Sequence, residues 1–402
     1  MGTSILFACV STACTTSSTS NDAEQITVYT AVEADQLKRY QWELRKAHPE
    51  LKVKWVRDST GVITAKLLAE QKNPQADVVM GLALTSLLVM EKKDLLQPYR
   101  PKHVEQLKID FYSQKDIPTW TGMTAWESAV CVNTVELEKK KLPIPQTWQD
   151  LTKPIYKGLI VMPNPASSGT GYLDVTAWMQ IFGEKQAWQY MQALDKNISQ
   201  YVHSGSKPCK MAAQGETVIG ISFGYPGFKL KSRGAPLEIV YPKEGLGWEM
   251  EASAIVKGTK KLSSAEKFID WSISQAANEA YAQNFSMVAH QNVHSKNQDF
   301  PKNLAQQLVK NDFYWAAEQR ESILKQWSAK DAEAQGLVVI GKVGKRAAIS
   351  QTATQAVTVK YADSGINYAA QGCWVYLCTG TSFVKNIANG KGKEALERLQ
   401  NN

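Results

Sequence analysis

A loop of small, hydroxyl-bearing residues offers the clearest opportunity for chemistry in this sequence. Ser167, Ser168, Gly169 and Thr170 stand just before a helix that the apolar spacing predicts over residues 171–182. The first N–H groups of a helix have no partner within it, so with neighbouring hydroxyls they form a ready site for an anion. The loop lacks the Gly-Lys-Ser/Thr ending of a nucleotide-binding P-loop, which argues against a nucleoside triphosphate. Ordinary capping of the helix by Ser168 or Thr170 is the alternative interpretation.

A second segment repeats this pattern later in the chain. Ser204, Gly205 and Ser206 again stand just before a predicted helix, and Pro208 suits its first turn, where the missing N–H costs nothing. Two hydroxyl-rich helix starts in one part of the fold could converge on a single tetrahedral oxyanion. The two segments together therefore indicate an anion-binding protein.

The other end of a ligand would meet side chains at strand ends. Tyr29 and Glu33 lie at the carboxyl end of the first predicted strand, the edge where open α/β sheets place their sites. Glu33 could pair with an ammonium group and Tyr29 could donate to an anion, although Glu33 would equally suit the first turn of a helix. Other aromatic or acidic residues near predicted strand ends are Trp126, Glu127, Tyr225, Trp248, Glu249 and Glu251. Of these, we take Tyr225 as a candidate ligand contact.

Other kinds of function find little support. There is no Gly-x-Ser-x-Gly or His-Glu-x-x-His motif, and the chain has only five His, so we assign no catalytic residue. None of the six cysteines has metal-ligand spacing, and we expect no metal or cofactor. The net charge of +8 is spread along the chain, which argues against nucleic acid and favours attraction of small anions.

The first 25 residues are typical of an export leader and tether. A short apolar stretch over residues 5–10 precedes a small-residue cleavage region that ends at Cys14, and the true start could lie upstream of Met1. Lipid attachment at Cys14 would anchor the protein to a membrane, whereas cleavage after Ala13 would release it. Both outcomes predict a periplasmic or extracytoplasmic location, where a disulfide between Cys131 and Cys209 is favoured.

The order of the predicted elements indicates two lobes and an extension. Strands and helices alternate from residue 26, which predicts an α/β fold with a parallel sheet covered by helices. The chain then builds a second lobe and returns, so that a hinged cleft is expected between the lobes. We assign residues 26–130 and 250–328 to lobe 1, residues 131–249 to lobe 2, and residues 329–402 to a C-terminal extension whose role the sequence does not reveal.

Residues 26 to about 328 resemble the 2-aminoethylphosphonate-binding proteins of ABC importers. These belong to the type II periplasmic binding proteins, which include ferric-ion binders. The stretches that carry the resemblance are Val28–Ala31, Ala76–Val79 with Gly81–Ala83, Val161–Gly171, His203–Lys210 and Pro242–Trp248. The resemblance implies a two-lobed fold that closes on its ligand, a permease and an ATPase as partners, and no chemistry on the ligand. It also implies that the Ser167–Thr170 loop and the Ser204–Ser206 turn hold the phosphonate group of the ligand. We expect the protein to be a monomer.

The sequence departs from the family's pattern after one strand of lobe 2. Ferric binders usually carry paired tyrosines here, and this chain has Tyr225 alone, which argues against iron. Gly224 and Pro226 replace an acid and an arginine that flank this tyrosine in related proteins, so the contacts to the amino group are left open. The alternatives are a binding protein for another small anion or ferric ion, an exported phosphoester-processing enzyme, and a lipid-anchored module whose tail binds a partner.

Overall fold

The computed structural model describes residues 25–295 and 300–334, together with six short strands between residues 337 and 384. The expected export segment and the lipidation site at Cys14 lie outside the described residues and stay predictions. Within the described ranges, no helix is long and apolar enough to cross a membrane.

The first lobe is built on a mixed sheet covered by helices. Strands β1, β2 and β3 run parallel, as predicted, but β10 returns antiparallel beside β3. These strands are β1 (Ile26–Thr30), β2 (Val53–Arg57), β3 (Val78–Ala83) and β10 (Trp248–Val256). The covering helices are α1 (Ala34–Ala47), α2 (Thr60–Ala69), α3 (Leu84–Lys92), α9 (Leu262–Ser272) and α10 (Gln275–Tyr281). Val78 packs on one face of the sheet and Val79 on the other. Because β3 is buried on both faces, its sequence is a continuous run of apolar residues.

The second lobe repeats this plan. Strand β6 pairs in parallel with β7 and β8, while β8 and β9 run antiparallel to β5. The strands are β6 (Ile160–Pro163), β7 (Ile198–Val202), β8 (Ile219–Phe223) and β9 (Leu237–Val240), and the helices are α5 (Gly169–Phe182), α6 (Glu184–Asp195), α7 (Lys207–Gln214) and α8 (Gly224–Lys231). Trp178 anchors the core, with edge-on contacts to Trp148 and Tyr190.

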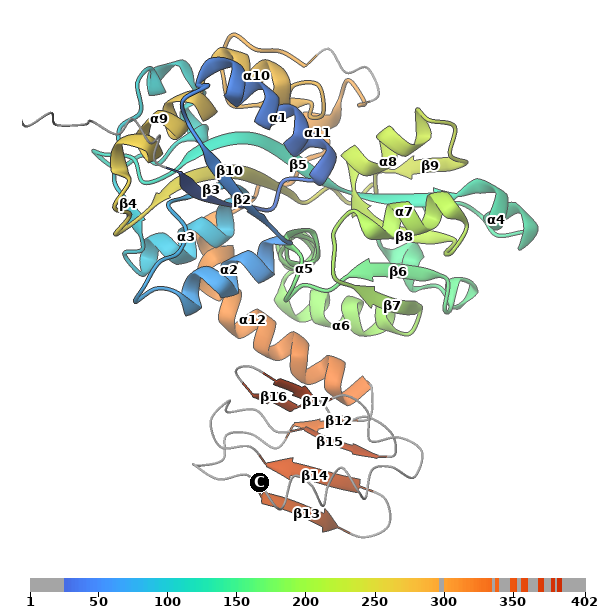
Figure 1. Ribbon diagram of the computed structural model, residues 1–402. Helices are drawn as coiled ribbons and strands as arrows, with labels where there is room; N and C mark the ends of the chain where they lie inside the picture. Colours follow the sequence, from blue (N-terminus) through green and yellow to red (C-terminus); the bar gives the residue numbers. More distant parts are fainter. Residues whose placement is uncertain are drawn as a thin grey trace, which may run out of the picture.

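One long strand, β5 (Thr121–Asn133), runs through both lobes (Figure 1). Its first half, up to Glu127, pairs with β10, and its second half, from Ser128, pairs with β8 and β9. The main strands of the two lobes therefore form one continuous sheet in the order β2-β1-β3-β10-β5-β8-β6-β7. This architecture confirms the two-lobed α/β fold. The boundaries assigned from the sequence, after residues 130 and 249, fall inside β5 and β10.

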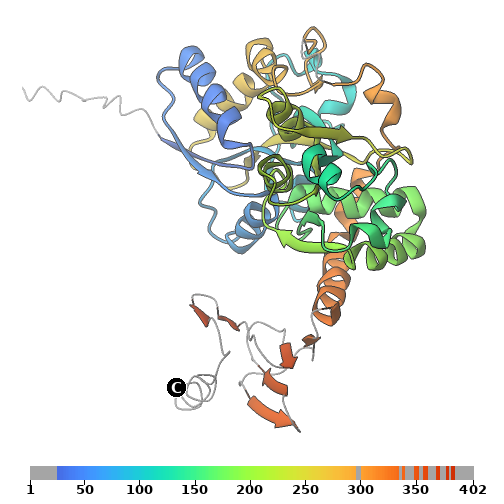
Figure 2. The ribbon, with the colours of Figure 1, turned by 90° about the vertical axis from the view of Figure 1, so that its right-hand side faces the viewer.

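A long helix leads from the lobes to the C-terminal extension. Helix α12 (Phe313–Ala334) begins against α3 and α5, where the Tyr172 hydroxyl donates to the Ala316 carbonyl at 2.5 Å, and it then runs away from the body (Figures 1 and 2). Beyond it lie an antiparallel sheet of β12 (Leu337–Val339), β15 (Tyr368–Gln371), β14 (Ala356–Lys360) and β13 (Ala348–Thr352), and a hairpin of β16 (Leu377–Thr379) and β17 (Ser382–Val384). The shorter elements of the chain's body are β4 (Leu96–Gln97), β11 (Met287–Val288), α4 (Thr134–Lys139) and α11 (Leu304–Gln307).

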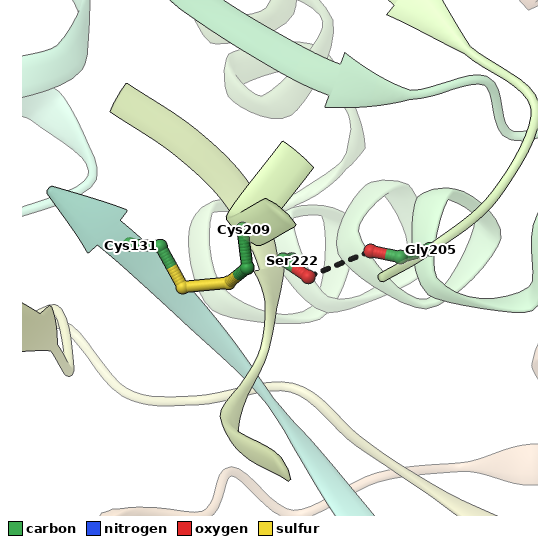
Figure 3. Close-up of a disulfide and its surroundings, with 4 residues drawn as sticks. All are labelled: Cys131, Gly205, Cys209 and Ser222. Carbon is green, nitrogen blue, oxygen red and sulfur yellow. Dashed lines mark hydrogen bonds between the residues drawn. A yellow bond between two sulfur atoms is a disulfide. The ribbon is translucent and has the colours of Figure 1, made fainter. Parts of the chain in front are cut away.

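The disulfide predicted between Cys131 and Cys209 is present (Figure 3). It joins β5 to the first turn of α7, with the two Cα atoms 5.2 Å apart. The Ser222 hydroxyl also donates to the Gly205 carbonyl at 2.6 Å, so the turn before α7 is tied to the sheet as well. These two links hold the Ser204–Ser206 turn in place against the core of lobe 2.

Removing this disulfide is expected to destabilise the protein. The half-cystines are 78 residues apart, and a disulfide typically stabilises a protein by about 2–4 kcal/mol, with long loops towards the upper end of that range. Urea unfolding of the C131A/C209A double variant should show a loss of that size in the free energy of unfolding. A reducing agent should lower the midpoint of the wild type alone. Equal stability of the wild type and the double variant would contradict the prediction.

Candidate ligand-binding site

A cavity lies where the carboxyl ends of the lobe 1 strands face the helix starts of lobe 2. Lobe 1 contributes the ends of β1, β2 and β3, the start of α2, and two side chains from the connecting strands. Lobe 2 contributes the start of α5, the turn before α7 and the end of β8. The lining residues are Ala31, Glu33, Gln36, Arg57, Ser59, Thr60, Gly81, Ala83, Trp126, Ser168, Gly169, Thr170, Ser204, Gly205, Phe223 and Glu251.

Two helix starts, one from each lobe, meet at this cavity. Ser59 is the N-cap of α2 and Ser168 is the N-cap of α5, and the Gly61 N–H donates to the Ser167 carbonyl at 3.0 Å across the gap between the lobes. A Cβ atom on Gly169 would lie only 2.8 Å from the Thr60 hydroxyl oxygen. Glycine therefore permits the close approach of the lobes, and the starts of both helices border the same cavity.

Some of the predicted hydroxyl residues line the cavity, and the others lie outside its lining. Ser168, Thr170 and Ser204 line the cavity together with Gly169, and the Ser168 oxygen also accepts from the Gly171 N–H at 3.4 Å, as a helix cap does. Ser206 is fully buried and accepts from the Lys210 ammonium at 2.8 Å.

Ser167 also stands outside the lining. Its hydroxyl donates to the His203 carbonyl at 3.2 Å, and its carbonyl receives the lobe-crossing N–H of Gly61. Ser167 and Ser206 therefore support the turns that carry the lining residues.

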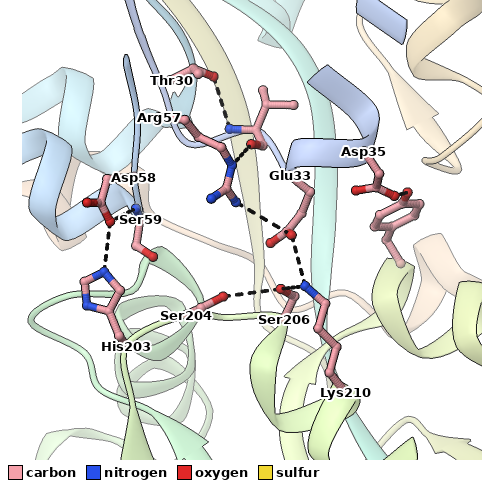
Figure 4. A network of polar contacts seen from close by, with 12 residues as sticks. Thr30, Glu33, Asp35, Arg57, Asp58, Ser59, His203, Ser204, Ser206 and Lys210 are labelled. Atoms are coloured by element: carbon pink, nitrogen blue, oxygen red, sulfur yellow. Dashed lines mark hydrogen bonds and ion pairs between the residues drawn. The ribbon is translucent and has the colours of Figure 1, made fainter. Parts of the chain in front are cut away.

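A chain of charges crosses the cleft beside the cavity (Figure 4). The Glu33 carboxylate lies 3.7 Å from the Arg57 guanidinium of lobe 1 and 3.4 Å from the Lys210 ammonium of lobe 2. The Asp58 carboxylate meets the His203 ring nitrogen at 2.9 Å. Arg57 lines the cavity but is not among the residues predicted from strand ends. The available signal was its place as the last residue of a strand that ends at the same edge as Glu33.

The two predicted tyrosines do not stand in the cavity lining. The Tyr29 hydroxyl donates to the Glu70 carboxylate at 3.0 Å, because Tyr29 faces the side of the sheet covered by α2 and α3. The Tyr225 hydroxyl donates to Asp35 at 2.8 Å and accepts from Lys229 at 3.0 Å, which links lobe 2 to lobe 1 outside the cavity. Neither tyrosine therefore lines the cavity, and a contact of either with the ligand stays a prediction.

Three buried acids lie on the strands that join the lobes. The Thr124 hydroxyl donates to Glu251 at 2.9 Å, and burial raises the pKa of Glu251 to about 7. Glu249 accepts from the Thr85 hydroxyl at 2.7 Å, and burial raises its pKa to about 7 as well. Burial likewise raises the pKa of Glu127 to about 8, and this carboxyl accepts a hydrogen bond from Tyr241.

The Glu127 carboxyl leaves no room for a side chain at residue 224. A Cβ atom on residue 224 would lie 2.1 Å from the Glu127 carboxyl oxygen and 2.8 Å from the Tyr241 hydroxyl oxygen. Glu127 therefore occupies the space where a side chain at this position would begin, and an acid there would need both neighbours to move.

These acids make the stability of the protein depend on pH. Their pKa values in the folded state lie above the ordinary value of 4.5, so the folded chain binds more protons than the unfolded chain between about pH 4.5 and pH 8. The free energy of unfolding should therefore fall as the pH rises through this window. The E127Q variant should show a shallower fall in urea titrations at several pH values, whereas E216Q, which changes an exposed acid, should follow the wild type. Identical slopes for E127Q and the wild type would contradict the prediction.

The fold and the cavity together define a class of protein, the two-lobed type II periplasmic binding proteins. The sequence model described as bacterial extracellular solute-binding protein matches residues 73–314, and the chain belongs to this family. Such proteins act outside the cytoplasm and serve a permease and an ATPase, so this chain is the solute-binding component of an ABC transporter.

Comparisons with individual proteins agree with this assignment. An uncharacterised protein of Haemophilus influenzae is 32% identical over 286 residues, which make up 69% of this chain and 82% of the relative. The probable ABC transporter periplasmic-binding protein y4fP of Sinorhizobium fredii is 26% identical over 59% of this chain and 66% of its own length. The structure of the periplasmic binding protein AfuA from Actinobacillus pleuropneumoniae, with exogenous fructose-6-phosphate bound, superimposes with a TM-score of 0.71 and 30% identity, covering 77% of this chain and 98% of AfuA.

Proposed function

We propose that this protein captures 2-aminoethylphosphonate in the interlobe cavity and delivers it, chemically unchanged, to its importer. The observation that carries the proposal is the meeting of the starts of α2 and α5 at one cavity that is also lined by the buried acid Glu251. The first feature suits a phosphonate and the second suits an ammonium group. The resemblance of the sequence to 2-aminoethylphosphonate-binding proteins supports the same ligand.

The donors around the helix starts match the needs of a phosphorus oxyanion. Ser59, Thr60, Ser168, Thr170 and Ser204 line the cavity, and their hydroxyls lie beside N–H groups that have no partner within their helices. The positive ends of the two helix dipoles favour an anion at this point. Hydrogen bonds to a charged oxygen are stronger than those between neutral groups, so several such donors suffice for tight capture.

Positive side chains strengthen this end of the cavity. Arg57 lines the cavity from lobe 1. Lys210 of lobe 2 forms an ion pair with Glu33, which also pairs with Arg57. A guanidinium presents a planar pair of donors that matches two oxygens of a phosphonate. Because the two cations come from different lobes, a bound anion would also favour the closed arrangement of the lobes.

A sugar phosphate is the second candidate ligand. AfuA was solved with fructose-6-phosphate, and the same hydroxyls and helix starts would suit the phosphate group of such a ligand. Buried carboxyls also accept hydrogen bonds from sugar hydroxyls. The two candidates share the phosphorus oxyanion and differ in whether the opposite end carries a positive charge.

Calorimetric titration of the purified, ligand-free protein separates these candidates. We expect 2-aminoethylphosphonate to bind with micromolar or tighter affinity and to change the tryptophan fluorescence, because Trp126 lines the cavity. Fructose-6-phosphate and inorganic phosphate serve as competitors in the same assay. Tight binding of fructose-6-phosphate with no heat from 2-aminoethylphosphonate would replace the first candidate by the second.

Removing one hydroxyl tests the anion site itself. The S168A variant should bind its ligand about tenfold more weakly or worse, since leaving a buried charged oxygen without a partner costs about 1–3 kcal/mol and about 1.4 kcal/mol corresponds to a factor of ten. Ser274 offers a matched control, because it caps α10 by accepting from the Ala277 N–H at 3.2 Å, far along the chain from the cavity lining.

The comparison of the two variants distinguishes capping from ligand binding. Both S168A and S274A should lose about 1 kcal/mol of stability through the lost cap. Only S168A should lose affinity. Unchanged affinity in S168A would mean that Ser168 serves as a helix cap alone.

A further inference from the structure

Among the acids at the cavity, Glu251 differs from Glu33 in having no cationic partner. Glu33 has both Arg57 and Lys210 within 4 Å, whereas Glu251 forms no ion pair with any residue in the described ranges. Its hydrogen bond from Thr124 is neutral. The side chain is buried, yet it borders the one cavity that the starts of α2 and α5 share.

This arrangement is costly for the protein on its own. A buried carboxylate without a cation loses its hydration and gains little in return, and the nearby charge of Glu33 adds repulsion. A hydrophobic residue or a glutamine at this position would avoid the cost. The side chain therefore has a use that the ligand-free protein does not reveal.

We infer that Glu251 is the specificity-determining residue of this site and that it binds the amino group at the far end of the ligand. Glu251 lies on β10 and faces Thr124 on β5, so it stands at the base of the cleft where the two lobes are joined. The helix starts hold the opposite, anionic end of the ligand. This inference rests on the proposed function and assigns the amino end to Glu251 instead of Glu33.

An ammonium group at this position would change the protonation of Glu251. The pKa of Glu251 is raised to about 7 in the absence of ligand, so the carboxyl is largely protonated at about pH 6. A bound cation favours the ionised form, and binding near this pH should therefore release a proton. Affinity for the amino ligand should rise with pH from about 6 to about 8 in the wild type, relative to a variant without this carboxyl.

The other titratable groups around Glu251 do not produce this effect. They are Glu33, with its partners Arg57 and Lys210, and the phenols of Tyr40, Tyr225 and Tyr281. Burial raises the pKa values of all three phenols, so they stay neutral near pH 7. The ionisation of the ligand's own phosphonate is common to the wild type and the variant, and it cancels in their difference.

The test compares ligands that differ only in the amino group. The full chain and the E251Q variant are titrated with 2-aminoethylphosphonate and with ethylphosphonate, and the pair of 2-aminoethyl phosphate and ethyl phosphate is run in parallel. Proton release is measured by calorimetry in buffers of different ionisation enthalpy. E249Q is the control, because Glu249 is also a buried acid on β10, but it accepts a hydrogen bond from Thr85 and does not line the cavity.

We expect the wild type to prefer the amino ligand by at least about tenfold. E251Q should lose this preference and the part of the proton release that comes from Glu251, measured as the difference between the two proteins. E251Q should bind ethylphosphonate at least as tightly as the wild type, because it removes a carboxylate that repels the anion, and this shows that its fold and its anion site are intact. E249Q should keep the preference.

Three results would overturn the inference. They are a preference that survives in E251Q, a preference lost in E33Q and kept in E251Q, and a wild type that prefers the amino ligand in neither pair. If the preference depends on Glu251 with the phosphate pair alone, the inference stands and the phosphonate assignment fails.

Discussion

The passage of β5 from one lobe into the other is the constraint on which the rest of the structure depends. Its first half pairs with β10 and its second half pairs with β8 and β9. The two lobes therefore share one sheet, and this strand fixes their positions relative to each other. Backbone hydrogen bonds along this strand set the register of both lobes. The starts of α2 and α5 come together where the lobes join, and both border the cavity.

The charges around the cavity show how stability and binding oppose each other here. Glu33 is compensated by a cation from each lobe, whereas Glu127, Glu249 and Glu251 are buried on the joining strands with neutral hydrogen-bond donors. Buried acids with raised pKa values weaken the fold as they ionise. Their concentration at the junction of the lobes indicates that this region is built for interaction with a ligand more than for stability.

The parts of the site that could be predicted from sequence are those whose chemistry is local. Ser168, Gly169, Thr170 and Ser204 were predicted because a hydroxyl-rich turn before a helix presents free N–H groups whatever surrounds it. Tyr29 was predicted from its place at a strand end, but neighbouring residues of a strand point to opposite faces, and the sheet packing turned this side chain towards Glu70. The disulfide followed from the export signal and from the number of cysteines in the body of the chain.

The sequence by itself therefore determined the class of fold through its periodic patterns and the hydroxyl-rich helix starts through residues adjacent in the chain. It determined the Cys131–Cys209 pair through the export signal and the number of cysteines. Only the tertiary structure decided which acids and cations meet at the cavity. Arg57, Lys210 and Glu251 lie far apart in the sequence, and their distances follow from strand order and from the closing of two lobes. Long-range electrostatic partners are set by that three-dimensional arrangement, which no local pattern encodes.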